Sequence, residues 1–274
     1  MTTIHRTAIA ATTVRYGRHR AFHNVVRSEF AKFFTVRSTY WMLLAAIAFN
    51  IGLAAALAIF IPGALSAQDK AAIDVTRLSL GGIHLSQIAF GVLGVLVITS
   101  EYGTGAIRTT LAAVPRRRTM LAAKAIVVAT TIFVLGVLSS FAAFFVFQAC
   151  LTDDALRTTL GDPGVLRAVS GGGLYVMVLA LLGFGLGVII RSSAGAIATL
   201  FGLLFVPPLL LGLLPVSWQT TIRPYVPMEA GGQIFIAVNT DPNALDPWVG
   251  FGIFGIYAAI AVGIGFLLIR HRDA

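Results

Sequence analysis

The most polar stretch of this sequence is EYGTGAIRTTLAAVPRRR, which runs from Glu101 to Arg118. It combines one carboxylate, two separated glycines, a proline and three arginines at its end. Charged groups such as Glu101 and Arg108 can form charge-assisted hydrogen bonds with a docked protein. These residue types therefore favour recognition of a partner over bond-breaking chemistry.

Motifs for catalysis and nucleotide binding are missing from the sequence. It contains no GxSxG, no HExxH and no pair of acidic residues within an apolar run. A P-loop needs a lysine directly after glycine, whereas Lys32, Lys70 and Lys124 all follow other residues. The single cysteine, Cys150, excludes an internal disulfide and a cysteine metal cluster. We therefore expect no catalytic residue, metal or cofactor in this chain.

The composition predicts a membrane protein. Of the 274 residues, 57% are hydrophobic and only 11% are charged, against about 25% charged in soluble domains. A helix needs about 20 apolar residues to cross the hydrocarbon core, and only helices satisfy every backbone polar group there. The charge-free runs predict an all-α integral membrane fold with six transmembrane helices. These lie near 39–61, 80–99, 122–150, 171–190, 194–214 and 248–269.

The distribution of charge predicts the orientation of these spans. With a cytoplasmic N-terminus, fifteen of the twenty Lys and Arg residues lie inside, whereas eight of the eleven acidic residues lie outside. This is the positive-inside pattern. We therefore expect the chain to cross the plasma membrane with both termini in the cytoplasm. The net charge of +9 thus reflects topology and not nucleic-acid binding. We expect residues 1–20 to be a basic cytoplasmic tail and 21–274 a single membrane domain.

Residues 21–38 have the pattern of an amphipathic helix on the inner membrane surface. The apolar side holds the residues Phe22, Val25, Val26, Phe30 and Phe33. Glu29 falls within this stripe. Two explanations remain open: a snorkelling or paired carboxylate, with Lys32 one turn away as its partner, or a contact with another protein.

Other polar and small residues in the spans have structural explanations. His84, Gln87 and Gln148 suit hydrogen bonds between helices better than a proton relay. Gly183 and Gly187 form a GxxxG that permits close helix approach, within the chain or between chains. Pro207 and Pro208 predict a kink or break in the fifth span. The outer loop 215–247 contains the short apolar run GGQIFIAVNT, which predicts a re-entrant hairpin before the last span.

The opening stretch itself predicts a short cytoplasmic helix near 103–114. Gly103 and Gly105 loosen the chain after the second span, Thr104 is a candidate N-cap, and Pro115 stops the helix. Ile107 and Leu111 share one face, with Arg108 beside them. A basic loop that only sets orientation would explain the arginines, but not this combination of glycines, short helix and proline.

At this stretch the sequence resembles the permease subunits of ABC type-2 exporters. The residues that carry the resemblance are Glu101, Tyr102, Gly103, Thr104, Gly105, Ala106, Ile107, Arg108, Leu111, Pro115, Arg116, Arg117, Arg118 and Lys124. It extends over nearly the whole chain, from the surface helix through six spans to the proline-bearing outer loop. The extra Gly105 is a departure from the family pattern, and it loosens the start of the short helix.

The resemblance implies a membrane subunit for export of a hydrophobic or amphipathic cargo, such as a drug, antibiotic or lipid. It implies pairing with a second permease, identical or related, and docking of separate ATP-binding-cassette subunits that hold ATP and Mg²⁺. The 103–114 segment would be the coupling helix. Its ATPase contacts would be Glu101, Tyr102, Gly103, Thr104, Gly105, Ile107, Arg108, Leu111 and Pro115. Glu29 and Lys32 of the surface helix would add a second contact.

Two other classes of function remain as alternatives. One is a membrane-embedded binding or regulatory protein with no ATPase partner. The other is an intramembrane enzyme, which the missing nucleophile and metal motifs disfavour. A neighbouring gene for an ATPase with a P-loop would favour the exporter over the regulatory protein.

Overall fold

The computed structural model of the chain is all-α and describes residues 18–66, 68, 70, 73–107, 117–239 and 241–271. Within these ranges, six helices are long and apolar enough to cross a membrane, which makes the chain a multi-pass membrane protein by this criterion. They are α2 (Arg37–Phe60), α5 (Ile83–Gly103), α7 (Arg117–Cys150), α8 (Val165–Ile190), α9 (Ser193–Leu211) and α12 (Pro247–His271). All six expected helices are present, although α7 begins at 117 and α8 at 165, earlier than 122 and 171.

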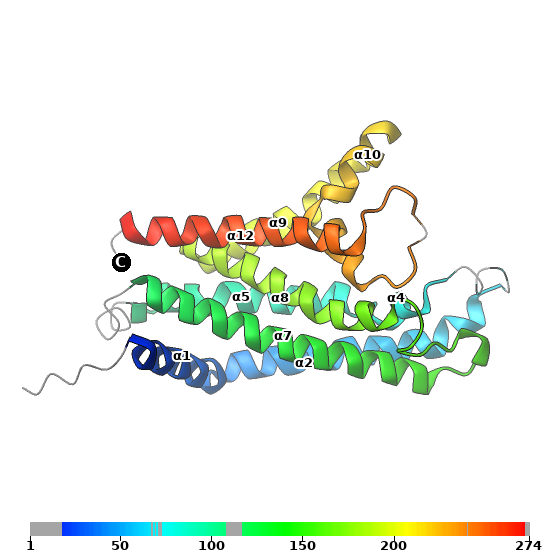
Figure 1. Ribbon diagram of the computed structural model, residues 1–274, viewed down its shortest axis with the longest axis horizontal. Helices are drawn as coiled ribbons and strands as arrows, with labels where there is room; N and C mark the ends of the chain where they lie inside the picture. The colour runs from blue at the N-terminus through cyan, green and yellow to red at the C-terminus, as the bar shows by residue number, and fades with distance from the viewer. Residues whose placement is uncertain are drawn as a thin grey trace, which may run out of the picture.

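The six long helices lie side by side, with α8 at the centre (Figure 1). α8 is the most buried of them and contacts α5, α7, α9 and α12, whereas α2 packs on α5 and α7 at one edge. The helix α1, the last turns of α5 and the start of α7 gather at the same end as the chain's C-terminus, at the left of Figure 1. We call this the inner end, because the charge distribution predicts that it faces the cytoplasm.

Glycines bring the backbones of α5 and α8 into direct contact. A Cβ atom at Gly94 would overlap the backbone carbonyl of Ala180, and one at Gly183 would lie 2.6 Å from the carbonyl oxygen of Gly91. Gly187 likewise faces Ile98 of α5. Both glycines of the GxxxG motif therefore permit close helix approach within the chain, the first of the two alternatives that the sequence left open.

The helix α1 (Arg18–Thr35) begins three residues before the expected boundary and is joined to α2 by the extended residue Val36. Its expected apolar stripe packs mainly against protein: Phe33 is 6% exposed, and Val26 and Phe30 border the main core. α1 lies chiefly on α7. The sequence pattern therefore identified the helix, while its position on a lipid surface stays a prediction.

Helix α9 continues through Pro207 and Pro208 to Leu211, so the chain does not break there, and the expected kink stays a prediction. The chain then enters the outer loop, which forms α10 (Val216–Ile222), η3 (Arg223–Tyr225), α11 (Pro227–Gly232) and η4 (Gln233–Phe235). The depth of this loop in a bilayer stays a prediction.

Two side chains, one from α8 and one from the residue before α4, hold the end of the outer loop. The Arg167 guanidinium donates to four backbone carbonyl oxygens, those of Gln233, Ile234, Ile236 and Ala237, and the shortest of these contacts is 3.0 Å to Ile236. A carboxylate oxygen of Asp74, which precedes α4 (Val75–Ser79), accepts hydrogen bonds from the amides of Ala237 and Val238. The loop is thus docked onto the outer end of the bundle through its backbone.

Candidate functional site

The candidate site begins where α5 ends. The hydroxyl of Thr104 donates to the Ser100 carbonyl oxygen at 2.8 Å, and its amide bonds to the same oxygen. Gly105 has a φ of +73°, a conformation that glycine adopts without strain. Ala106 and Ile107 are helical again. Thr104 therefore closes α5, while its expected role as N-cap of the following helix stays a prediction.

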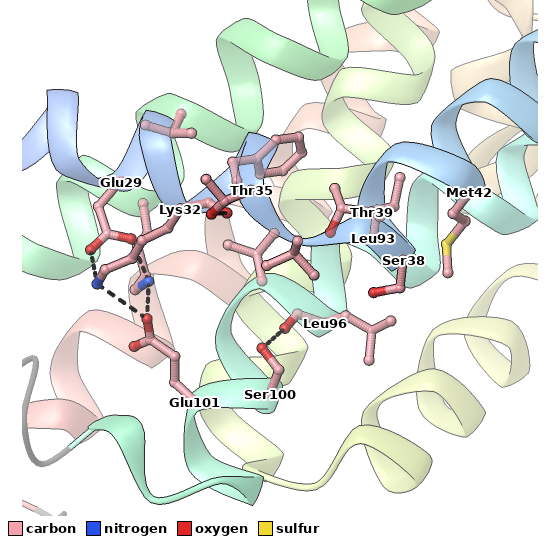
Figure 2. A pocket seen from close by; sticks show the side chains of 15 residues that line it. Glu29, Lys32, Thr35, Ser38, Thr39, Met42, Leu93, Leu96, Ser100 and Glu101 are labelled. Atoms are coloured by element: carbon pink, nitrogen blue, oxygen red, sulfur yellow. Dashed lines mark hydrogen bonds and ion pairs between the residues drawn. The ribbon is translucent and has the colours of Figure 1, made fainter.

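Four charged side chains from three helices meet beside this turn. Figure 2 labels three of them, Glu29, Lys32 and Glu101. We call Glu29 and Lys32 of α1, Glu101 of α5 and Lys124 of α7 the charged cluster. The Lys124 ammonium lies 2.5 Å from Glu29 Oε2 and 2.7 Å from Glu101 Oε1. Lys32 Nζ lies 2.8 Å from Glu29 Oε1 and 3.6 Å from Glu101 Oε1. Glu29 and Glu101 thus share two lysines, and the four charges balance.

Burial divides the cluster into an enclosed part and an open part. The side chains of Lys124 and Glu29 are 2% and 5% exposed, and that of Glu101 is 13% exposed. Lys32 is 47% exposed. Removing one partner from a buried ion pair is far more costly than removing one from an exposed pair, because a charge is left without compensation in a poorly solvated site. The enclosed pair of contacts made by Lys124 is thus the structural centre of the cluster.

The open member, Lys32, remains a cation over a wide pH range. Partial burial alone would lower the pKa of its ammonium group, but hydrogen bonding and attraction to Glu29, and then to Glu101, outweigh that effect and raise the pKa. A raised pKa means that this attraction is fully present below the ordinary value of 10.5 and is lost only as pH rises through the higher folded value.

The structure shows which groups surround the carboxylates of Glu29 and Glu101. The paired-carboxylate explanation for Glu29 is confirmed, since Lys32 binds it one turn away and Lys124 binds it from α7. Glu101 follows the second span but is not surrounded by water, since its side chain is only 13% exposed. α1 covers the start of α7, so both carboxylates are enclosed between helices. The proposed ATPase contacts of these residues stay predictions.

A second set of contacts lies on the other side of the α5 end. The guanidinium of Arg191, in the turn between α8 and α9, lies 5.1 Å from the ring centre of Tyr102, within the range of a cation–π interaction. At the first residue of α9, Ser193 Oγ donates to Thr99 Oγ1 at 2.8 Å. Arg117, at the start of α7, donates to the Ile269 carbonyl oxygen of α12 at 3.3 Å. These contacts, together with the charged cluster, link the inner ends of α1, α5, α7, α8, α9 and α12 into one network.

The remaining candidate contact residues fall into three groups. Gly103, Thr104 and Gly105 are exposed. Ile107 is 4% exposed and belongs to the main core, so its side chain is turned toward the chain itself. Arg108, Leu111 and Pro115 lie outside the described residues.

Sequence reasoning underrated two buried polar residues. The sequence pattern gives no role to Asn50, and it gives none to Lys124 beyond its place in the family motif and the absence of a preceding glycine. The amide of Asn50 in α2 donates to Ser139 Oγ of α7 at 2.9 Å, within the bundle. A signal for Lys124 was available: Glu29 and Glu101 are two of only three acidic residues expected on the inner side, and each sits beside an apolar segment.

The cluster is not suited to bind a metal ion, since lysine ammonium groups already occupy its carboxylates. Among the residues described, no group of three or more His, Cys, Asp or Glu side chains is close enough to hold one. The expectation of no cofactor in this chain stays a prediction.

Comparison with models of known protein families gives no match, and comparison with curated proteins finds no relative. The structure shows an all-helical, multi-pass membrane protein by its six candidate spans.

Proposed function

We propose that this chain is the membrane-spanning subunit of an ATP-driven exporter of the ABC type-2 class. A separate subunit hydrolyses ATP, and the spans form part of the path for a hydrophobic or amphipathic cargo. The chain itself has no catalytic residue. A second permease chain completes the path.

The observation that most supports this proposal is the set of contacts around the end of α5. Glu101 joins that end to α7 and α1 through Lys124, while Tyr102 and Thr99 join it to the turn between α8 and α9. A force on the segment that follows Tyr102 would therefore act on several spans at once. This is what a docking segment needs in order to pass ATP-driven motion to a membrane domain.

The contacts also suggest a division of roles within the motif. The enclosed Glu29 and Glu101 act as positioning residues that hold α1, α5 and α7 in register, and Ile107 anchors the start of the short helix. The exposed turn at Gly103–Gly105 and the residues from Arg108 to Pro115 provide the surface for the ATPase. Lys32 is exposed enough to reach a partner as well.

Site-specific crosslinking tests this proposal. A photoreactive amino acid replaces Leu111 in the chain, expressed in its own host, and Trp218 of the outer loop is replaced as the matched control. Trp218 is 60% exposed, so a reactive group at this position is accessible. We expect position 111 to crosslink to a P-loop ATPase and position 218 not to do so.

The ATPase activity of the two proteins together provides the second half of the test. The chain and the ATPase are reconstituted together, and ATP hydrolysis is measured with the parent and with Arg108→Ala. We expect the variant to insert normally but to lose stimulation of hydrolysis. Recovery of no nucleotide-binding protein at position 111 would contradict the exporter proposal and favour the membrane-embedded regulatory protein.

A further inference from the structure

The start of α2 presents an exposed face that combines one arginine with two aromatic residues and a leucine. Tyr40, Trp41 and Leu44 are 53%, 64% and 43% exposed, and Arg37 is exposed as well. They follow Arg37 by three, four and seven positions, so all four lie on one side of the helix. The rings of Tyr40 and Trp41 contact each other edge to face, with centroids 5.7 Å apart. We call these four residues the α2 face.

The length of α2 places this face at the membrane surface. α2 has 24 residues, hence a length of about 36 Å, which exceeds the roughly 30 Å hydrocarbon core only slightly. Its first turn therefore lies at headgroup level when α2 crosses the membrane. α2 also begins farther from the inner tip of the bundle than α7 does (Figure 1). Tyrosine and tryptophan are enriched at headgroup level, because their rings are apolar and carry one polar group.

The charge of Arg37 has no counterpart at the inner end. Among the residues that the structure describes, its guanidinium makes no hydrogen bond and no ion pair. The sequence has only three acidic residues on the predicted inner side, Glu29, Glu101 and Asp273. The first two are enclosed and paired with lysines, and Asp273 follows α12, outside the described residues. The exposed charge beside α1 and α2 is therefore cationic, and Arg27 of α1 adds to it.

We infer that the α2 face binds the headgroup of an anionic phospholipid in the leaflet at the inner end. The Arg37 guanidinium offers parallel N–H donors that match two oxygens of a phosphate. Tyr40 and Trp41 lie beside the ester region of the lipid, and Leu44 contacts its acyl chains. A phosphatidylcholine has the same phosphate, but Arg37 repels its choline cation. The face therefore selects a headgroup with net negative charge.

Quenching of tryptophan fluorescence by brominated lipids tests this inference. The chain has three tryptophans, and the double change Trp218→Phe and Trp248→Phe leaves only Trp41. This variant is reconstituted in phosphatidylcholine vesicles that contain the same small fraction of brominated phosphatidylglycerol or brominated phosphatidylcholine. We expect phosphatidylglycerol to be enriched about fivefold at Trp41, which is the effect of one arginine near an anionic surface. The enrichment should decrease at high salt, because salt screens this attraction.

Two controls separate selection by charge from general contact with lipid. Arg37→Gln keeps a polar side chain without the charge, so the preference should be lost while quenching by brominated phosphatidylcholine stays the same. A variant with Trp248 alone places the reporter in the first turn of α12, where it is 58% exposed and its amide donates to the Asp246 carboxylate. We expect no preference for the anionic lipid at Trp248.

Three results would overturn the inference. Two of them are equal quenching of Trp41 by both lipids and a preference that persists in Arg37→Gln. The third is the absence of quenching by either lipid, which would show that a protein surface, such as a second copy of the chain, covers the α2 face. The inference concerns this chain alone and does not rest on the exporter proposal, which the crosslink at position 111 tests separately.

Discussion

Lys124 is almost fully removed from solvent, yet it carries a charge between two carboxylates from different helices. An ion placed in such a site costs several kcal/mol to desolvate, and only close, well-oriented partners offset this cost. The contacts of 2.5 and 2.7 Å meet that requirement. The cluster therefore contributes mainly to the specific arrangement of α1, α5 and α7, and less to net stability.

Replacing Lys124 with Met should destabilise the protein strongly. The change keeps the side-chain volume but leaves Glu29 and Glu101 enclosed without their shared cation, so the free energy of unfolding should fall by about 3–5 kcal/mol. Lys32→Met removes a half-exposed partner of the same two carboxylates and should cost at most about 1 kcal/mol. Thermal unfolding of the purified variants compares the two. Equal losses would show that burial does not determine the strength of these pairs.

At the scale of elements, the close contact between α5 and α8 depends on glycines, which have no side chain to keep the two backbones apart. Gly94→Ala should force the two helices apart, because its methyl group would meet the Ala180 backbone, and overpacking of this kind costs about 1–3 kcal/mol. Gly52→Ala in α2 is the matched control, since a Cβ there meets nothing within 4 Å. The melting temperature should fall for Gly94→Ala only. A lower value for both variants would indicate a general intolerance of alanine.

The outer loop should loosen when Arg167 is replaced. Arg167→Ala removes the guanidinium that binds the loop carbonyls, and each lost hydrogen bond to a charged group is worth about 1.5–3 kcal/mol. Hydrogen exchange at the Ala237 and Val238 amides should then accelerate by roughly tenfold to a hundredfold. Arg157→Ala is the control, because Arg157 is exposed and pairs with Asp154. Unchanged exchange in Arg167→Ala would mean that Asp74 alone holds the loop.

Across the whole molecule, the sequence predicts what depends on local pattern. Long apolar runs determine where the chain can be helical in a membrane, so all six spans were expected within a few residues. Periodicity also identified α1. The charged cluster was not predicted, because Glu29, Glu101 and Lys124 meet only through the packing of three helices. For the same reason nothing in the sequence marks Gly94 as a helix contact, whereas the spacing of Gly183 and Gly187 predicts close helix packing.

The orientation of the molecule can be tested with two residues at opposite ends of α7. This helix has 34 residues, hence a length of about 50 Å, which exceeds the roughly 30 Å hydrocarbon core. Arg118 near its start and Asp154 just beyond its end are both exposed, and Asp154 is 88% exposed. Both positions should therefore lie in water on opposite sides of the membrane. The excess of Lys and Arg predicts that position 118 is cytoplasmic.

Single cysteines at these positions, in a Cys150→Ala background, report the orientation through an impermeant thiol reagent. In intact cells Asp154→Cys should be labelled and Arg118→Cys should not, whereas permeabilised cells should label both. Labelling after permeabilisation controls for folding and thiol reactivity. Labelling of position 118 in intact cells would show that the chain has the opposite orientation in the membrane. The charged cluster and the Glu101–Arg118 stretch would then face outward, where no ATP-hydrolysing subunit could dock. This measurement thus tests the exporter proposal through the topology that it requires.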